Sequence, residues 1–385
     1  MSVPWWVWPQ SVAWTLAHVY LWARLVRATT APRSRGRRAG TVAALLLGAL
    51  VPATLIATNA LDPALSRWLA WPGYTWYGLA LYLVMVLLVS EPIRLAATVR
   101  RRRRAATVPA SAAGPTRRLV LERSIAAVAG VVATGTVGYG MATALGPPRL
   151  DHVTVPLRRG GRAVNGFRIA LVGDVHLGPM LGRAHAQRIV DLVNGTGADL
   201  VAIVGDLAEG GVEYLADAAA PLRDLRSRHG SYFVTGNHEY ISGADAWVEE
   251  LRELGVRPLR NERVELPGFD LAGVNDLTGQ EQGDAPDYAR ALDGRDPARP
   301  VVLLAHQPVQ VREAARHGVD LQLSGHTHGG QVMPLTLLTA LTQPALAGHA
   351  RYGDTRLYVT RGTGFTGPPI RVGAPPDITI VRLAT

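Results

Sequence analysis

The distribution of apolar residues divides this chain of 385 residues into two parts of different character. Residues 1–146 contain long, almost uncharged apolar runs, whereas residues 151–385 contain short apolar runs separated by polar, Gly-containing segments. Apolar runs of about 20 residues are typical of helices that cross a bilayer, and runs of about four to eight are typical of buried strands. The pattern therefore predicts an all-α transmembrane region followed by an α/β domain.

The first part contains the runs that are long enough to cross a bilayer. These runs are residues 5–26, 41–60, 74–90 and 125–145. Eight of the nine Trp lie before position 77 and gather near the ends of the runs, as in the aromatic belts of membrane proteins. The first run is the least regular because Gln10, His18 and Arg24 interrupt it. We expect about four transmembrane helices.

Arginine is distributed unevenly among the loops between these runs. Residues 27–38 carry five Arg and residues 94–123 carry nine, whereas residues 61–73 carry one Arg and one acid. Loops rich in Arg stay on the cytoplasmic side of a membrane. With four spans, both chain ends then lie on the outer side, so the domain at 151–385 is expected to be extracytoplasmic.

The formal net charge of +10 does not indicate a nucleic-acid partner, because the two parts differ in charge. Residues 1–124 hold 16 Arg and 3 acids, whereas residues 151–385 hold 23 Arg and 27 acids, a balance of 23 − 27 = −4. The run Arg100–Arg104 is better interpreted as a topology signal that contacts anionic lipid headgroups. The segment Thr116–Leu121 resembles a twin-arginine export signal, and a plain topogenic Arg pair is the alternative.

Five short apolar, β-rich runs in the second part are each followed by side chains that can bind a metal. The runs are Ile169–Val172, Leu200–Val204, Tyr232–Val234, Val301–Leu304 and Leu321–Leu323. The segments after them are Gly173-Asp174-Val175-His176, Gly205-Asp206, Gly236-Asn237-His238-Glu239, Ala305-His306 and Gly325-His326-Thr327-His328. Since α/β folds bind ligands beyond the carboxyl ends of their strands, these segments are expected to converge. Asp, Asn and His suit divalent cations, and the absence of Cys argues against a structural zinc or iron–sulfur site.

The order of these motifs resembles that of the calcineurin-like metallophosphoesterases. The resemblance covers residues 167–383, and the stretches Gly329–Gln331 and Arg361–Gly364 resemble the bacterial membrane-associated branch of that family. It implies a domain of two mixed β-sheets flanked by α-helices. It also implies a metal-dependent phosphoesterase, that is, a hydrolase acting on ester bonds.

The resemblance further implies a dinuclear centre of two divalent ions, such as Mn, Fe or Zn, held by seven side chains. Asp174, His176 and His328 would hold one ion, Asn237, His306 and His326 the other, and Asp206 would bridge both. Two such ions polarise the phosphoryl oxygens and lower the pKa of a shared water, which gives a hydroxide nucleophile near neutral pH. His238, next to Asn237, is placed to protonate the leaving group as a general acid. The alternative for His238 is a hydrogen-bond donor that only supports a ligand.

The sequence leaves the substrate open, because phosphomonoesters, phosphodiesters and pyrophosphates present the same oxygens to the metals. A membrane anchor favours a lipid-borne phosphate, and the apolar stretch Met333–Leu341 either reaches toward the acyl chains or packs inside the domain. Asp276 and Thr363 either line the site or shape its loops. The alternative function is a metal-binding, membrane-anchored assembly or sensor module without significant turnover. No pattern indicates an oligomeric state.

Overall fold

The computed structural model of the chain describes residues 7–105, 117–159, 161 and 163–385. The chain divides into two compact units, Met1–Met141 and Ala142–Thr385. The described part of the first unit is helical. Its elements are α1 (Val7–Leu21), the π-helix Trp22–Arg27, α2 (Arg35–Ala60), α3 (Pro63–Val89), α4 (Glu91–Ala105) and α5 (Arg117–Leu145), whose last residues belong to the second unit.

Three helical stretches among the described residues are long and apolar enough to cross a membrane. They are Arg35–Ala60, Pro63–Arg100 and Arg117–Leu145, and they contain the predicted spans 41–60, 74–90 and 125–145. Leu45, Leu46 and Val131 expose 69%, 68% and 74% of their surface, as expected for helices that face lipid. The predicted span 5–26 begins with two residues outside the described part and continues as α1 and the π-helix. The number of spans stays a prediction.

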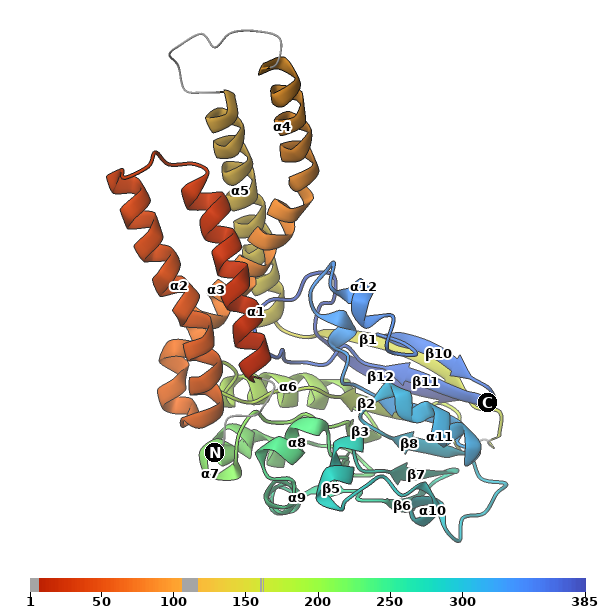
Figure 1. Cartoon of the computed structure of the whole chain (residues 1–385). Helices are drawn as coiled ribbons and strands as arrows, with labels where there is room; N and C mark the ends of the chain where they lie inside the picture. The colour runs from red at the N-terminus through yellow and green to blue at the C-terminus, as the bar shows by residue number, and fades with distance from the viewer. Residues whose placement is uncertain (1–6, 106–116, 160, 162) are drawn as a thin grey trace. The chain divides into compact units, whose positions relative to one another are not determined.

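The second unit contains two six-stranded sheets (Figure 1). The first has the order β1 (Arg149–Pro156), β12 (Asp377–Ala384), β2 (Arg168–Val172), β3 (Leu200–Ile203), β4 (Ser231–Phe233), β5 (Val256–Pro258). The second has the order β10 (Gly348–Tyr352), β11 (Thr355–Val359), β9 (Leu321–Ser324), β8 (Val301–Leu304), β7 (Phe269–Gly273), β6 (Glu262–Leu266). Strands β2 to β5 run parallel, as do β7, β8, β9 and β11, while β12 runs antiparallel to β2 and the edge strands β6 and β10 are antiparallel to their neighbours. Both sheets are mixed, which confirms the predicted fold class.

The inner strands are buried on both faces. Ile169 and Leu171 of β2 pack in one core with Leu304 of β8, whereas Ala170 and Val172 pack in another core with the helices. The helices that share a core with the first sheet are α6 (Arg183–Thr196), α7 (Val212–Ala219) and α9 (Ala244–Glu253), and those that share one with the second are α10 (Tyr288–Leu292) and α11 (Val311–Arg316). Two further short helices are α8 (Asn237–Ser242) and α12 (Thr336–Thr339). Burial on both faces explains why these strands appear in the sequence as continuous apolar runs.

Candidate metal centre

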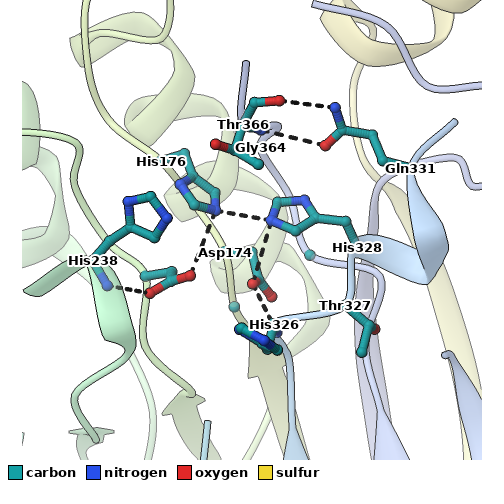
Figure 2. A network of polar contacts seen from close by, with 12 residues as sticks. Asp174, His176, His238, His326, Thr327, His328, Gln331, Gly364 and Thr366 are labelled. Atoms are coloured by element: carbon teal, nitrogen blue, oxygen red, sulfur yellow. Dashed lines mark hydrogen bonds and ion pairs between the residues drawn. The ribbon is translucent and has the colours of Figure 1, made fainter. Parts of the chain in front are cut away.

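The loops that follow five strands bring all the predicted site residues to one place. Asp174 and His176 follow β2, Asp206 follows β3, Asn237 and His238 begin α8 after β4, His306 follows β8, and His326 and His328 follow β9. Figure 2 shows Asp174, His176, His238, His326 and His328 gathered around the same small volume. The site therefore draws on both sheets.

One group of side chains consists of Asp174, His176 and His328, all buried. The Nε2 atoms of His176 and His328 are 2.9 Å apart, and His328 Nε2 is 3.5 Å from Asp174 Oδ1. Asp174 Oδ2 is buried and has no hydrogen-bond partner in the described chain. A buried carboxylate oxygen without a donor is costly, and a cation would satisfy it.

A second group consists of Asp206, Asn237, His306 and His326. His306 Nε2 lies 3.1 Å from Asp206 Oδ2 and 3.1 Å from Asn237 Oδ1, and His326 Nδ1 lies 2.9 Å from the same Asn237 oxygen. Asp206 Oδ2 is also 3.8 Å from His176 Nε2 in the first group. The Asp206 carboxylate thus lies between the two groups.

Hydrogen bonds on the far side of two imidazoles orient their free nitrogens toward the centre. His306 Nδ1 is 2.7 Å from the carbonyl oxygen of Val204, which can only accept, so Nδ1 donates and Nε2 is the ring nitrogen that can face a cation. His176 Nδ1 is 2.6 Å from Glu209 Oε1, with the same consequence. Such outer contacts are typical of metal-binding histidines.

The backbone holds five of these residues in the left-handed region. The φ angles are 51° at Asp174, 51° at His176, 53° at Asp206, 71° at His326 and 52° at His328. This conformation costs about 1 kcal/mol or more for a non-glycine residue, and it is concentrated at functional sites. The neighbouring glycines are required for space, since a Cβ at Gly325 would collide with the Asp174 carboxylate and one at Gly236 with that of Asp206.

The protein groups alone leave the site with charges that suit a cation. Burial raises the pKa of Asp174 to about 6, although His306 opposes this shift. Burial and the nearby His306 lower the pKa of His326 to about 3, and burial lowers the pKa of His328, with Arg371 adding to the effect. Burial alone would lower the pKa of His306, but the nearby Asp206 raises that pKa well above its ordinary value, so a cation bound at His306 Nε2 would displace a proton. The neutral His326 and His328 and the buried carboxylates are donors that suit divalent cations.

Comparison with known proteins agrees with this geometry. Residues 167–330 match the family model described as calcineurin-like phosphoesterase. The chain is 36% identical to a "transmembrane protein with metallophosphoesterase domain" of Danio rerio, over 96% of this chain and 86% of the relative. The chain belongs to the calcineurin-like phosphoesterase family.

Two other relatives are matched over less of their length. A Bos taurus protein with the same description is 39% identical over 69% of this chain and 63% of its own length. An "uncharacterized metallophosphoesterase" of Helicobacter pylori is 41% identical over 56% of this chain and 60% of its own length. The family establishes that the chain is a metal-dependent phosphoesterase hydrolase. The transmembrane relatives and the three long apolar helices identify it as a membrane protein, and its described residues include clusters of His and Asp that could hold a metal ion.

Glu239 of the metallophosphoesterase ties two of the loops together. Its buried carboxylate accepts hydrogen bonds from the backbone N–H groups of Leu207 (2.7 Å), Asp206 (2.9 Å) and Gly236 (2.6 Å). Asp206 Oδ1 in turn accepts from the backbone N–H of His238, at 2.9 Å. These bonds fix the Asp206 loop against the start of α8.

Glu209 was missed in the sequence, although it lies only three residues after Asp206. Its Oε1 is hydrogen-bonded to His176 Nδ1 at 2.6 Å and its Oε2 lies 3.0 Å from His238 Nδ1, so one carboxylate contacts both rings. Burial alone would lower the pKa of His238, but the carboxylates of Glu209 and Asp206 outweigh it and raise the pKa to about 10. Without bound cations, His238 is therefore protonated at neutral pH.

Arg371 was also missed. Its fully buried guanidinium donates to the carbonyl oxygens of His328 (2.7 Å), Arg361 (2.9 Å) and Gly364, and lies 3.0 Å from His328 Nδ1. It is 43 residues from His328 in sequence, and no motif linked the two. Arg371 holds the His328 loop against the loop that follows β11.

Asp276 and Thr363 make contacts that shape loops. Both Asp276 carboxylate oxygens lie 3.0 Å from Gln307 Nε2, and Oδ1 also accepts from the backbone N–H of Thr278 at 2.8 Å. Thr363 donates from its hydroxyl to Gly173 O at 3.3 Å. Of the two alternatives left by the sequence, these contacts favour loop positioning.

Replacing Asp206 with Asn tests its place between the two groups. A neutral amide binds a cation less well than a carboxylate, so Asp206→Asn should lower metal content at both groups and reduce turnover by several orders of magnitude. Metal content per chain and the rate of aryl phosphodiester hydrolysis measure this. The matched control is Asp217→Asn on the exposed face of α7. Full metal content with full turnover in Asp206→Asn would contradict the assignment.

Replacing Glu209 with Gln tests the charge next to His238. Because the Glu209 carboxylate raises the pKa of His238, its loss should lower that pKa, so the activity that requires protonated His238 should decline at a lower pH than in the wild type. The pH–rate profile of an alkyl phosphoester measures the shift, with metal content determined in parallel. Glu213→Gln, exposed on α7, is the control. An unchanged alkaline limb would exclude this role.

Proposed function

We propose that the protein is a membrane-anchored dinuclear-metal phosphohydrolase. Asp174, His176 and His328 would hold one cation, Asn237, His306 and His326 would hold the second, and Asp206 would be shared by both. The observation that carries this assignment is the position of Asp206 Oδ2, 3.8 Å from His176 Nε2 and 3.1 Å from His306 Nε2. A carboxylate that lies between two clusters of His, Asn and Asp side chains suits a pair of cations.

Bound Mn, Fe, Zn or a similar pair of cations would supply Lewis acidity to the phosphoryl oxygens and activate a water. His238 supplies a proton to the leaving oxygen as general acid. Two properties support this role: the carboxylates of Glu209 and Asp206 raise the pKa of the ring, and Glu209 Oε2 lies 3.0 Å from Nδ1, so the other ring nitrogen is the one not facing that carboxylate. Glu239 and Arg371 act as positioning residues for the loops that carry the ligands.

The substrate we propose is a phosphodiester or a lipid-linked phosphate or pyrophosphate. The argument is location, because the metal centre lies in the same chain as three helices that are long and apolar enough to cross a membrane. A site held near a bilayer meets phosphate groups on lipids at high local concentration. No nucleic-acid partner is proposed, since residues 151–385 have an excess of four acids over Arg.

We also propose that the catalytic unit lies outside the cytoplasm. The Arg-rich residues 27–38 precede the apolar core of α2, and residues 94–123 separate α3 from the apolar part of α5. With both basic segments inside, the chain leaves α5 on the outer side whether or not residues 5–26 cross the membrane. The proposed orientation therefore does not depend on whether residues 5–26 form a fourth span.

The function is tested with full-length protein in detergent, assayed with Mn²⁺ on a nitrophenyl phosphodiester and an alkyl phosphodiester. Turnover should require the metal and stop on chelation. His238→Ala should lose about 10²- to 10⁴-fold on the alkyl ester and much less on the nitrophenyl ester, because nitrophenolate leaves without a proton. His152→Ala, exposed on β1, is the control. Equal losses on both esters would indicate a role for His238 other than general acid.

Orientation is tested with reporters fused to the full chain. A reporter that is active only outside the cytoplasm should be active after Thr385 and inactive when inserted between residues 105 and 115. Replacing Arg100–Arg104 with Gln should make the second fusion partly active, because positive charge retains this loop inside. An inactive reporter after Thr385 in the native sequence would place the catalytic unit in the cytoplasm.

A further inference from the structure

An uncharged stretch of sequence begins three residues after His328, the last proposed ligand. Residues 331–350 contain no Asp, Glu, Lys or Arg, although residues 151–385 as a whole carry 50 charged residues (23 Arg and 27 acids). We call residues 331–350 the apolar segment. It contains α12 and ends in β10.

Three leucines at the tip of the apolar segment are exposed. Leu337, Leu338 and Leu341 expose 62%, 64% and 82% of their surface. They do not pack inside the domain, which was one of the alternatives left by the sequence. Exposed large apolar side chains in an uncharged segment are typical of a site of contact with a protein or a membrane.

The base of the apolar segment is fixed to the site. Gln331 Nε2 donates to the carbonyl oxygen of Thr366 (2.9 Å), and its Oε1 accepts from the Thr366 backbone N–H (3.3 Å), as Figure 2 shows. At the other end, the Thr327 hydroxyl donates to Leu346 O at 2.5 Å. Since Thr327 lies between His326 and His328, both ends of the leucine tip connect to the loop that carries these two histidines.

The end of α5, the last apolar helix, packs near the loop that contains Thr366. The second unit begins at Ala142, so the final turn of α5 belongs to it. In that unit Ala144 and Leu145 pack with Leu181 and with Phe365, the residue before Thr366. The chain therefore leaves the apolar part of α5 beside the loop that binds Gln331.

Chain length limits how far the leucine tip can lie from the end of α5. Leu338 follows Gln331 by seven residues, a span of at most about 25 Å even when fully extended. A lipid surface at the end of α5 is thus within reach of the tip. An apolar, uncharged tip flanked by polar protein suits the boundary between headgroups and acyl chains.

We propose that the tip of the apolar segment, Leu337, Leu338 and Leu341, inserts into the bilayer that α5 enters, on the side of the catalytic unit. The bilayer surface is the occupant because the uncharged tip and the exit of α5 share one corner of the unit. The contact holds the His326–His328 loop facing the lipid headgroups. This inference adds to the proposed function a fixed orientation of the site toward a lipid-borne phosphate, and that consequence for turnover rests on the proposed function.

The contact is tested by fluorescence on the full chain in liposomes. Because the protein has no Cys, Leu338→Cys carries one environment-sensitive dye at a unique position. Its emission should shift to the blue and be quenched by lipids that bear a spin label near the headgroup end of the acyl chain. The control is Tyr214→Cys on α7, also an exposed large side chain, at 42%. Quenching no greater than in this control would overturn the proposal.

Nanodiscs that hold a single copy of the chain distinguish lipid from a second copy. Quenching that persists in them supports insertion, whereas a blue shift without lipid quenching, lost at one copy per disc, would mean that another chain covers the tip and would overturn the proposal. This readout needs no turnover, so it succeeds or fails separately from the proposed function.

The effect on catalysis is measured with the double variant Leu338→Asp, Leu341→Asp. Turnover of a water-soluble nitrophenyl phosphodiester should match the wild type, because neither side chain touches the metal centre. Turnover of a phosphodiester carried by a vesicle lipid should fall at least several-fold. Equal rates on the lipid ester in variant and wild type would overturn the role of insertion in presenting the site. Failure of both wild-type and variant protein on both esters would instead contradict the proposed function.

Discussion

Two buried carboxylates facing a cluster of imidazoles are the constraint on which the second unit depends. Asp174 and Asp206 are fully or almost fully buried, and Asp174 Oδ2 has no hydrogen-bond donor among the described residues. Burying such charges is unfavourable unless positive charge compensates them. Divalent cations would provide that charge. The five left-handed backbone positions at this site are of the kind that is concentrated at functional sites.

Charged residues next to the proposed ligands stabilise the strained loops that carry those ligands. Glu239 binds three backbone N–H groups, Glu209 orients His176 and His238, and Arg371 binds the loops on either side of His328. Each joins segments that come from different strands. A charged residue that makes several hydrogen bonds is suited to this because its bonds are stronger than those between neutral groups. The ligand loops are therefore positioned by buried charges as well as by the apolar core.

The ligands and the outer contacts differ in how well the sequence reveals them. The proposed ligands could be located because each follows an apolar strand that is buried on both faces, so the run and the polar residue after it are adjacent in sequence. The two mixed sheets and their flanking helices followed from the family resemblance. Arg371 could not be found, because its partners lie up to 43 residues away and depend on how the loops pack. Glu209 left a local signal, because it is an acid three residues after Asp206. Its contact with His238 could not be foreseen, because His238 lies in the segment after a different strand, β4.

The charge of the catalytic unit bears on how it meets a substrate. Residues 151–385 carry 23 Arg and 27 acids, so before cations bind the unit does not attract an anionic phosphate at long range. Electrostatic attraction therefore does little to raise the rate at which an anionic substrate reaches this unit. Salt also screens attractions between exposed charges that are more than about 10 Å apart. A membrane anchor raises the encounter rate in a different way, because a tether increases the local concentration of groups on the membrane surface without any added charge. The charge balance of the catalytic unit and the membrane anchor therefore both support the proposed preference for phosphates borne by the membrane over phosphates dissolved in bulk solution.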